Sequence, residues 1–458
     1  MRVIVCGAGQ VGFSIASYLS RENNDVTIID SDPETIADVN THLDVNSVLG
    51  SASNPEVLSN AGASDADMII AVTNTDEVNM VACQVAHSLF NVPKKVARIR
   101  QTDFRNTKWS NLFSRAHMPI DVIVSPEAEV AKSVAMRLAV PGTTNVVPLA
   151  GKKAYLCGVI CEENCPVINT PLKQLSTLFP DVKVKILTII RHGKPFIPSP
   201  DDQMLMWDEV FFLVEESQIQ RSLSIFGHEE HKARNVVIVG GGKIGQALLD
   251  EILENQSDVQ LKIIESSSET ALALSEKYED ILVLEADGLD SQVMDEANIS
   301  QVETLIAVTN NDEANILMSM MALQEGCERV IPLVNKAGYN TLTGSLGLGS
   351  VISPRSITVS SIMRHVRRGR VKAVHDVANH FAEVLEMEVS QSSSILNTPI
   401  QDAKFPHGVI VAAIVRDEEV LIPKGETIMR ADDLAIILSI ADHVGMVEKM
   451  FSAQVDLF

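Results

Sequence analysis

Short apolar runs alternate with amphipathic stretches over the first 140 residues of the chain. The runs have the length of buried strands, and the stretches between them have helical spacing. The predicted strands are 2–6, 26–29, 48–49, 68–72, 96–99 and 122–124. The predicted helices are 11–20, 33–40, 54–61, 76–90, 103–116 and 126–139. Strands that alternate with helices are typical of a doubly wound, Rossmann-like parallel sheet.

The pattern changes after Pro141-Gly142. Apolar runs at 154–161, 184–191 and 209–214 are separated by one short helical stretch at 172–178 and by turn residues such as His192-Gly193. Strands of this length with a single short helix predict a small α+β subdomain.

Both parts of the pattern occur twice. Val3–Gly12 recurs as Val236–Gly245, and Ala71–Asn79 recurs as Ala307–Asn315 with seven of nine residues identical. A fixed repeat of this length indicates a duplicated unit. The sequence therefore predicts an α/β protein with two tandem Rossmann-like doubly wound parallel sheets, each followed by a small α+β subdomain. The expected domains are 1–140, 145–228, 233–370 and 372–458.

A glycine motif follows the first strand of each copy. Gly7-x-Gly9-x-x-Gly12 and Gly240-x-Gly242-x-x-Gly245 each precede a helix, which is the context of a dinucleotide fingerprint. The first glycine permits a tight turn, the second lets a pyrophosphate approach the backbone, and the third lets the helix pack on the strand. For the second copy, a degenerate loop kept only for packing is the alternative.

An acidic residue ends the second strand of each copy. Asp30 lies 18 residues after Gly12, and Glu265 lies 20 residues after Gly245, at the distance expected for a carboxylate that binds a ribose diol. A carboxylate here would repel a 2′-phosphate, so NAD is favoured over NADP. ATP or ADP would satisfy the same contact.

Polar residues follow the fourth and fifth strands, at the edge where ligands of such sheets bind. We interpret Thr73, Asn74, Thr309 and Asn310 as walls of the two sites, with ordinary turn chemistry as the alternative. The acids Asp76-Glu77 and Asp312-Glu313 are interpreted as first-turn residues that complement the helix dipole.

Arg98 ends the fifth strand of the first copy, where its guanidinium could bind phosphate oxygens. The sequence aligns it with Pro332, which has no charge, so the two sites are expected to differ. Another difference is Ser51, which stands opposite Asp287 after the third strand.

Composition limits the classes of partner. The chain has 37 Lys+Arg against 60 Asp+Glu, a net charge of −23, which argues against binding to nucleic acid or directly to anionic lipid. A basic protein partner, such as the cytoplasmic loops of a membrane protein, stays possible. No segment has the length of a membrane span and the N-terminus lacks a signal-peptide core, so a cytoplasmic protein is expected.

A cysteine series and a basic cluster are two further candidate sites. The series Cys157, Cys161 and Cys165 lacks a fourth metal ligand and is interpreted as core packing, and no metal site is expected. A basic cluster lies near the end of the predicted helix 354–368; its members are Arg364, Arg367, Arg368, Arg370 and Lys372. Three roles are open for it: it complements the helix dipole, it docks on the acidic face of a neighbouring subunit, or it binds the phosphates of that subunit's nucleotide.

Catalytic motifs are missing from the sequence: there is no nucleophile elbow, P-loop or H-E-x-x-H. This argues against an enzyme. The rival hypotheses are an NAD-dependent oxidoreductase and an assembly scaffold with vestigial sites.

The duplicated glycine units, the Asp30 and Glu265 pair and the T-N-x-D-E-x-N strings resemble the tandem regulator-of-K⁺-conductance (RCK/KTN) family, over essentially the whole chain. The resemblance implies a regulatory subunit that assembles into a cytoplasmic dimeric or tetrameric ring and binds NAD(H), or ATP or ADP, especially at the second site. It also implies control of a membrane potassium-translocating subunit of the TrkH or TrkG type at the cytoplasmic face of the inner membrane.

The same resemblance implies which residues bind nucleotide. In the first copy they are Gly7, Ala8, Gly9, Gln10, Val11, Gly12, Asp30, Thr73, Asn74 and Arg98. In the second copy they are Gly240, Gly241, Gly242, Lys243, Ile244 and Glu265, with Thr309 and Asn310 nearby. The helices 126–139 and 354–368 are expected to link each Rossmann-like unit to its own small subdomain and to act as levers.

Overall fold

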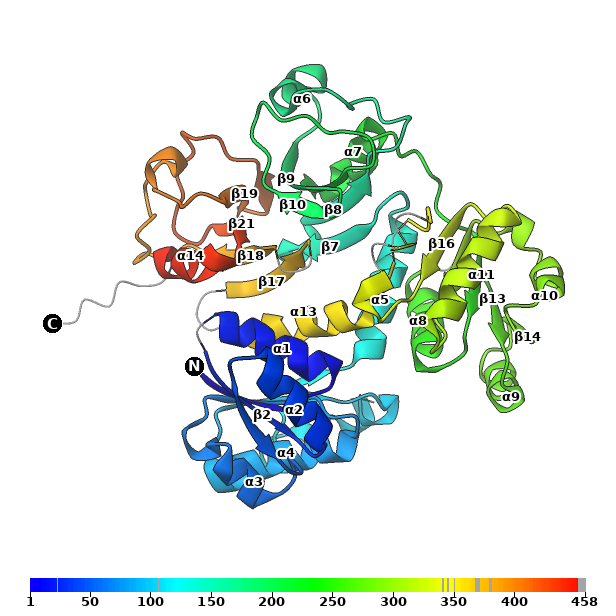
Figure 1. The fold of residues 1–458 in the computed structure, drawn as a ribbon. Helices are drawn as coiled ribbons and strands as arrows, with labels where there is room; N and C mark the ends of the chain where they lie inside the picture. The colour runs from blue at the N-terminus through cyan, green and yellow to red at the C-terminus, as the bar shows by residue number, and fades with distance from the viewer. Residues whose placement is uncertain are drawn as a thin grey trace. The chain divides into compact units, whose positions relative to one another are not determined.

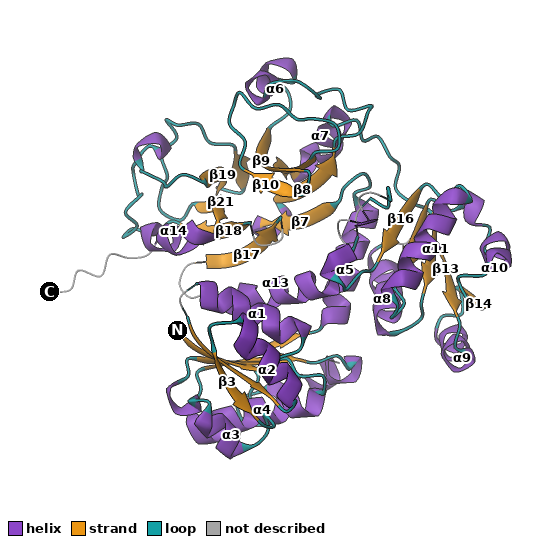
Figure 2. Ribbon diagram, in the orientation of Figure 1, coloured by secondary structure: helices purple, strands orange, loops and turns teal. Residues whose placement is uncertain are grey.

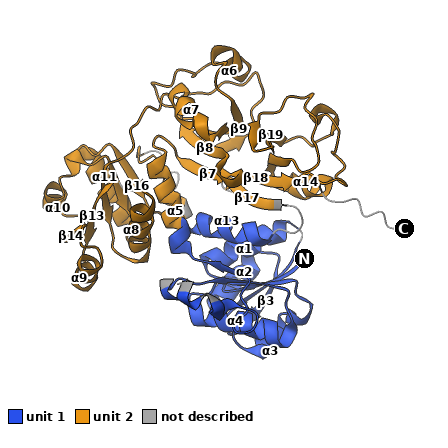
Figure 3. Cartoon of the chain, turned by 180° about the vertical axis from the view of Figure 1, so that it is seen from behind, with its two compact units in different colours: residues 1–129, 354–367 blue, residues 130–353, 368–458 orange. Residues whose placement is uncertain are grey.

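The computed structural model of the chain contains four β-sheets, two parallel and two antiparallel (Figures 1 and 2). It forms two compact units, residues 1–129 with 354–367 and residues 130–353 with 368–458 (Figure 3). The described residues are 1–22, 24–105, 107–256, 258–339, 342–343, 346–349, 351–366, 371–378 and 381–451.

The first parallel sheet has the strand order β3-β2-β1-β4-β5-β6. Its strands are β1 (Arg2–Cys6), β2 (Asp25–Asp30), β3 (Asn46–Leu49), β4 (Met68–Ala71), β5 (Lys94–Arg98) and β6 (Val122–Val124). The helices between them are α1 (Gln10–Arg21), α2 (Pro33–His42), α3 (Pro55–Asn60) and α4 (Asp76–Phe90). Strands β1 and β4 are buried on both faces, which explains why their sequences are continuous apolar runs.

The second parallel sheet repeats this order as β14-β13-β12-β15-β16. Its strands are β12 (Asn235–Val239), β13 (Gln260–Glu265), β14 (Leu282–Glu285), β15 (Thr304–Ala307) and β16 (Arg329–Pro332). Its helices are α8 (Lys243–Asn255), α9 (Ser268–Lys277), α10 (Ser291–Glu296) and α11 (Asp312–Gln324). An isolated parallel bridge between Leu333 and Ile352 lies beyond β16.

The two antiparallel sheets share one strand order, β10-β9-β11-β8-β7 and β20-β19-β21-β18-β17. The first small subdomain contains β7 (Asn145–Leu149), β8 (Ala154–Ile160), α6 (Leu172–Leu178), β9 (Val184–Arg191), β10 (Lys194–Phe196), β11 (Glu209–Glu215) and α7 (Ile219–Ile225). The second contains β17 (Val371–Val377), β18 (Ala382–Glu388), β19 (Val409–Arg416), β20 (Glu419–Leu421), β21 (Leu434–Ile440) and α14 (Val444–Phe451).

The small subdomains pack against each other. Leu156 and Phe211 of the first lie in one buried cluster with Val384 and Leu438 of the second. The backbone N–H of Ala150 also donates to the Glu386 carboxylate at 3.0 Å. The two subdomains therefore share a core and belong to the same compact unit.

The helices α5 (Pro126–Ala139) and α13 (Pro354–Val366) are exchanged between the two copies. Helix α13 follows the second parallel sheet in sequence, yet its Val359 and Ile362 are buried in the core of the first, beside α1 (Figures 1 and 3). The end of α5 contacts the second copy, where the Gln256 amide donates to the carbonyl of Ala135 at 2.8 Å. Along the chain each helix still connects the parallel sheet of its own copy to the small subdomain of that copy, as expected, and its contacts with the other copy are an addition that the sequence did not predict.

The helix predicted over 103–116 is also wrong. The structure has two 3₁₀ segments instead, Thr102–Arg105 and Thr107–Phe113. The predicted end of the helix 354–368, beyond Val366, lies outside the described residues.

The fold class predicted from the sequence is confirmed, whereas the four domain boundaries stay a prediction. All six cysteines are buried and unbridged, in line with a packing role. Within the described residues, no helix combines the length and the apolar character required to cross a membrane.

Candidate functional site

The first glycine-rich loop joins β1 to α1 at the carboxyl edge of the first sheet. Gly7 has a φ of +100°, and a Cβ there would lie 2.9 Å from the backbone of Thr73. A Cβ on Gly12 would lie 1.7 Å from the carbonyl oxygen of Gly7. Gly9 differs, because the position of its absent Cβ faces open space. Gly7 and Gly12 are therefore required by the fold, whereas Gly9 leaves room for a ligand at the start of α1.

The second loop repeats this arrangement. Gly240 has a φ of +109°, and its Cβ would lie 3.0 Å from the backbone of Thr309. A Cβ on Gly245 would lie 2.0 Å from the carbonyl oxygen of Gly240, while that of Gly242 would face open space. The second loop thus retains the backbone shape of the first and the same open approach.

The predicted acids lie directly beside these loops. Asp30 Oδ2 accepts a hydrogen bond from the N–H of Ala8 at 2.6 Å, and Glu265 Oε2 accepts one from the N–H of Gly241 at 2.6 Å. The other oxygen of each carboxylate accepts from the N–H two residues further along the chain. Each oxygen has a further lone pair, so both carboxylates retain acceptor positions for ribose hydroxyls.

A buried asparagine fixes the wall of the first site. Asn79 Oδ1 accepts from the N–H and the hydroxyl of Thr73, at 2.9 and 2.7 Å. Its Nδ2 donates to the carbonyl of Arg98 at 2.9 Å. Asn79 therefore connects the ends of β4 and β5, and sequence reasoning did not assign it this role.

Asn315 does the same in the second copy. Its Oδ1 accepts from the N–H and the hydroxyl of Thr309, at 3.0 and 2.6 Å, and its Nδ2 donates to the carbonyl of Leu333 at 2.9 Å. The signal was present in the sequence, since Asn79 and Asn315 end the two T-N-x-D-E-x-N strings.

These contacts correct the alignment of Arg98. Ala71 pairs with Ala97 in the first sheet, and Ala307 pairs with Pro332 in the second. Pro332 is thus the equivalent of Ala97, and the equivalent of Arg98 is Leu333. The second site still lacks the positive charge of Arg98, as expected, but the uncharged residue at that position is Leu333 and not Pro332.

Arg98 presents a partly unsatisfied guanidinium at the first site. Its Nη2 donates to the carbonyl of Thr73 at 2.7 Å, while its buried Nε has no hydrogen-bond partner among the described residues. Burial, and to a smaller extent the charge of Arg100, lowers the pKa of Arg98. A phosphate group would supply both the missing acceptor and the opposite charge.

The first-turn acids have a second role that the helix-dipole interpretation omitted. Asp76 is buried, and its Oδ2 accepts from the N–H groups of Arg100 and Gln101, at 2.9 and 3.0 Å. Asp312 accepts from two N–H groups of the loop after β16, at 2.9 and 2.8 Å. Both acids therefore fasten the loop after the fifth strand to the fourth crossover helix.

The second site carries positive charge at other positions. Lys243 is the exposed first residue of α8, where the first copy has Gln10. Lys336 pairs with Glu313 at 2.6 Å, and Tyr339 also donates to Glu313 at 2.6 Å. These bonds lower the pKa of Glu313 to about 2.

The remaining predicted residues lie at the same edges. Gln10 and Val11 form the first turn of α1, and Ile244 lies in the first turn of α8. Asn74 and Asn310 are exposed just beyond β4 and β15. The structure therefore brings the predicted residues of each copy to one sheet edge.

The described members of the basic cluster pair with acids. Arg364 donates to Glu129 at 2.7 Å, and Lys372 lies 2.9 Å from Glu388. Arg367, Arg368 and Arg370 lie outside the described residues. In the described part of the chain, no group of three or more His, Cys, Asp or Glu residues is placed to bind a metal ion.

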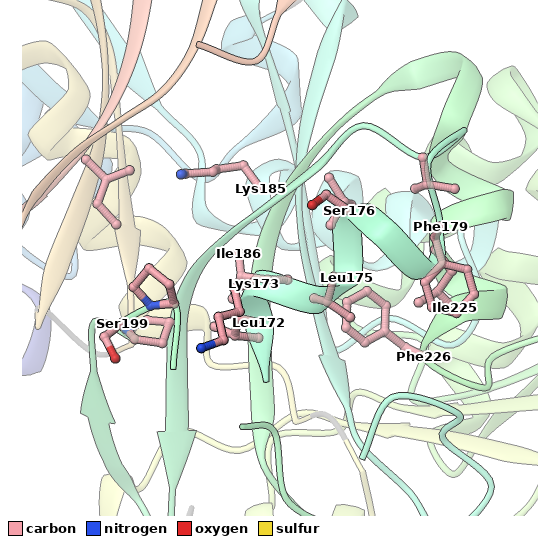
Figure 4. A pocket seen from close by; sticks show the side chains of 15 residues that line it. Leu172, Lys173, Leu175, Ser176, Phe179, Lys185, Ile186, Ser199, Ile225 and Phe226 are labelled. Atoms are coloured by element: carbon pink, nitrogen blue, oxygen red, sulfur yellow. The ribbon is translucent and has the colours of Figure 1, made fainter. Parts of the chain in front are cut away.

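A separate pocket of about 330 Å³ lies in the first small subdomain (Figure 4). Leu175, Phe179 and Phe226 contribute apolar walls, Lys185 lies at its margin, and Ile410 of the second small subdomain completes the lining. None of the predicted nucleotide-binding residues lines it.

Comparisons with known proteins cover the whole chain. Residues 3–126 and 236–354 match the TrkA-N domain, and residues 384–452 match the TrkA-C domain. The chain is 43% identical over 458 residues to the Trk system potassium uptake protein TrkA of Azorhizobium caulinodans, covering 100% of both chains. It is 37% identical over 462 residues to TrkA of Halomonas elongata, again covering 100% of both.

Solved structures share the fold at low sequence identity. The RCK domain of GsuK superimposes with a TM-score of 0.61 at 14% identity, covering 98% of this chain and 94% of that one. The GsuK channel bound to NAD gives a TM-score of 0.59 at 15% identity, covering 98% and 78%.

Proposed function

Because the chain belongs to the TrkA family of Trk system potassium uptake proteins, we propose that it is a nucleotide-binding regulator that gates a membrane potassium-translocating subunit of the TrkH or TrkG type. Its place is the cytoplasmic face of the inner membrane, reached through that partner, and it works as a dimeric or tetrameric ring. It is a regulator and not an oxidoreductase.

The nucleotide proposal is carried by two features of the same sheet edge: the open backbone at Gly9 and the unpartnered Nε of Arg98. The loop N–H groups and the start of α1 suit a pyrophosphate, and Asp30 suits an unphosphorylated ribose. Arg98 Nε supplies a donor that the described residues leave unused. The first site therefore binds NAD or NADH, in agreement with the NAD-bound channel of similar fold.

The second site has the same loop with a different charge distribution. Leu333 stands at the position of Arg98 and has no charge, while Lys243 adds an ammonium group at the first residue of α8. A cation at the start of α8 favours a nucleotide whose terminal phosphate group lies close to the loop. We assign ATP or ADP to this site, with Glu265 on the ribose.

Gating follows from differential affinity. A nucleotide shifts the equilibrium between two states of the ring only by the difference in its affinity for them. The bound partner changes the nucleotide affinity by the same factor. Because α13 packs on the first sheet, a ligand at the first site acts on a helix that leads in sequence to the second small subdomain.

The glycine pair Gly9 and Gly242 permits a direct test. Gly9→Ala and Gly242→Ala add one methyl group into open space, so both variants fold normally. The affinities for NADH, NAD, ATP and ADP are measured by isothermal titration. Gly9→Ala should weaken NADH binding about tenfold or more, whereas Gly242→Ala should weaken only the binding of ATP and ADP. Potassium flux through the partner should lose its dependence on the affected nucleotide.

Other outcomes would contradict the proposal. A wild-type chain that binds none of these nucleotides is an assembly scaffold. A chain that consumes NADH in the presence of a small substrate is an oxidoreductase.

A further inference from the structure

A surface turn of the first small subdomain carries an exposed tryptophan in an unfavourable backbone conformation. The turn precedes β11, and Asp208 anchors it by accepting from the N–H of Leu205 at 2.8 Å and from Arg191 at 2.7 Å. At its tip Trp207 has a φ of +68°. Left-handed backbone is disfavoured for residues with a bulky side chain.

The second small subdomain contains the same turn with a different tip. Asp433 accepts from the N–H of Arg430 at 2.7 Å and from Arg416 at 2.7 Å. The residue at the tip is Asp432, whose φ is also +68°. Asp adopts this conformation more readily than an aromatic residue. The chain thus contains an internal control in which the turn forms without tryptophan.

The architecture of the turn therefore does not account for Trp207. Its side chain is 65% exposed and that of the adjacent Met206 is 48% exposed, whereas the second copy has Ala431 and Asp432 at these positions. An aromatic and a methionine side chain together on a surface, where one of them also strains the backbone, are typical of a binding contact.

The surroundings of this tip are acidic. The N–H of Trp207 donates to the carbonyl of Cys161 at 2.7 Å, which places the tip beside the turn that carries the exposed Glu162 and Glu163. A tryptophan face next to carboxylates suits a Lys or Arg side chain, which would gain both a cation–π contact and an opposite charge.

We propose that Met206 and Trp207 dock a Lys- or Arg-bearing cytoplasmic segment of the membrane potassium-translocating subunit. This proposal rests on the proposed function, which supplies a membrane protein partner, and the cytoplasmic loops of membrane proteins are enriched in Lys and Arg. An anionic lipid surface is disfavoured because the flanking carboxylates and the net charge of −23 would be repelled by it. A second copy that met this tip with its own acidic tip would be repelled by Glu162 and Glu163.

The test uses the full-length chain and the membrane subunit in lipid nanodiscs. W207D places the residue of the second copy in the first turn, so the fold and the nucleotide affinities should not change. The affinity for the nanodisc-embedded subunit should fall about tenfold or more, whereas Trp207→Phe should retain most of it. Leu178→Asp is the matched control, because it adds a charge at another exposed apolar residue of the same subdomain, 55% exposed, and should bind normally.

The alternatives give distinguishable results. Equal binding by wild type and W207D overturns this proposal alone, whereas a wild-type chain that binds no membrane subunit overturns the proposed function as well. Binding of wild type, but not W207D, to protein-free anionic vesicles overturns it in favour of a lipid surface. Dissociation of the W207D oligomer in light scattering overturns it in favour of a second copy. If W207D lowers the melting temperature, Met206→Ala provides the same comparison, and an unchanged affinity in that variant overturns the proposal.

Discussion

The N–H of Ala8 donates to Oδ2 of Asp30 at 2.6 Å, so the carboxylate expected to bind a ribose also fixes the shape of the glycine loop. Asp30→Ala removes both contributions at once. We expect it to weaken NADH binding about 10- to 100-fold, because a hydrogen bond to a charged group contributes about 1.5–3 kcal/mol. Isothermal titration measures the change.

Glu265→Ala serves as the control for Asp30→Ala. It removes the equivalent bond to Gly241 in the second copy and should leave NADH binding at the first site unchanged. Equal loss of NADH affinity in both variants would show that the two loops do not bind their ligands independently.

Asn79→Ala is expected to destabilise the first sheet and its nucleotide site together. Asn79 is fully buried, and its removal leaves the N–H of Thr73 and the carbonyl of Arg98 without their partner. Unsatisfied groups of this kind cost about 2–4 kcal/mol in total. Hydrogen exchange of β4 and β5 should accelerate, and Asn315→Ala should produce the same effect in β15 and β16. Unchanged exchange in β4 would refute the connecting role of Asn79.

The exchange of helices predicts that a mutation in one copy destabilises the other. Ile362 of α13 is fully buried in the core of the first sheet, so Ile362→Ala should cost about 2–5 kcal/mol there. Hydrogen exchange should accelerate in β1 and α1 and not in β12. Val134 occupies the equivalent position in α5 and is also fully buried, so Val134→Ala should spare β1. Acceleration confined to β12 in the Ile362 variant would contradict the exchange.

The burial of Glu383 should make the stability of the second small subdomain depend on pH. Glu383 is only 2% exposed, and burial, with a smaller effect of Glu448, raises its pKa to about 8. The unfolded chain releases this proton near pH 4.5, whereas the folded chain retains it until about pH 8. Stability therefore falls as the pH rises through this interval.

Glu383→Gln should abolish most of that dependence. At pH 8.5 it should be more stable than wild type by on the order of 3 kcal/mol, whereas near pH 5 the two should be similar. Thermal unfolding at both pH values measures this. Parallel pH profiles would show that Glu383 ionises normally in the folded chain.

Much of the fold could be predicted from the sequence because its strands are short apolar runs bounded by turn residues. β1, β6, α4 and α5 have the predicted bounds. β7 was missed because it contains Pro148 and lies at the edge of its sheet, where the apolar signal is weak. The segment after Arg98 is rich in Thr, Ser and Asn, which are poor helix formers, and it adopts 3₁₀ turns.

The parts of the site that a motif defines were predictable, whereas its supporting contacts were not. Glycine spacing located both loops, and strand ends located Asp30 and Glu265. The one-residue error at Pro332 arose because only strand pairing fixes the equivalence to Arg98. The apolar face of α13 indicated that the helix is buried, but a single sequence does not reveal which of the two sheets the helix packs against.

The exchange of α5 and α13 also bears on the ratio in which the two ligand sites are produced. In a protein with a single copy of this design, a helix placed as α13 is placed here would have to come from another molecule, and stability would then depend on concentration. With both copies in one chain, the covering helix is always present at a high effective concentration. Two unequal ligand sites are thereby produced in a ratio of one to one, however little protein the cell makes.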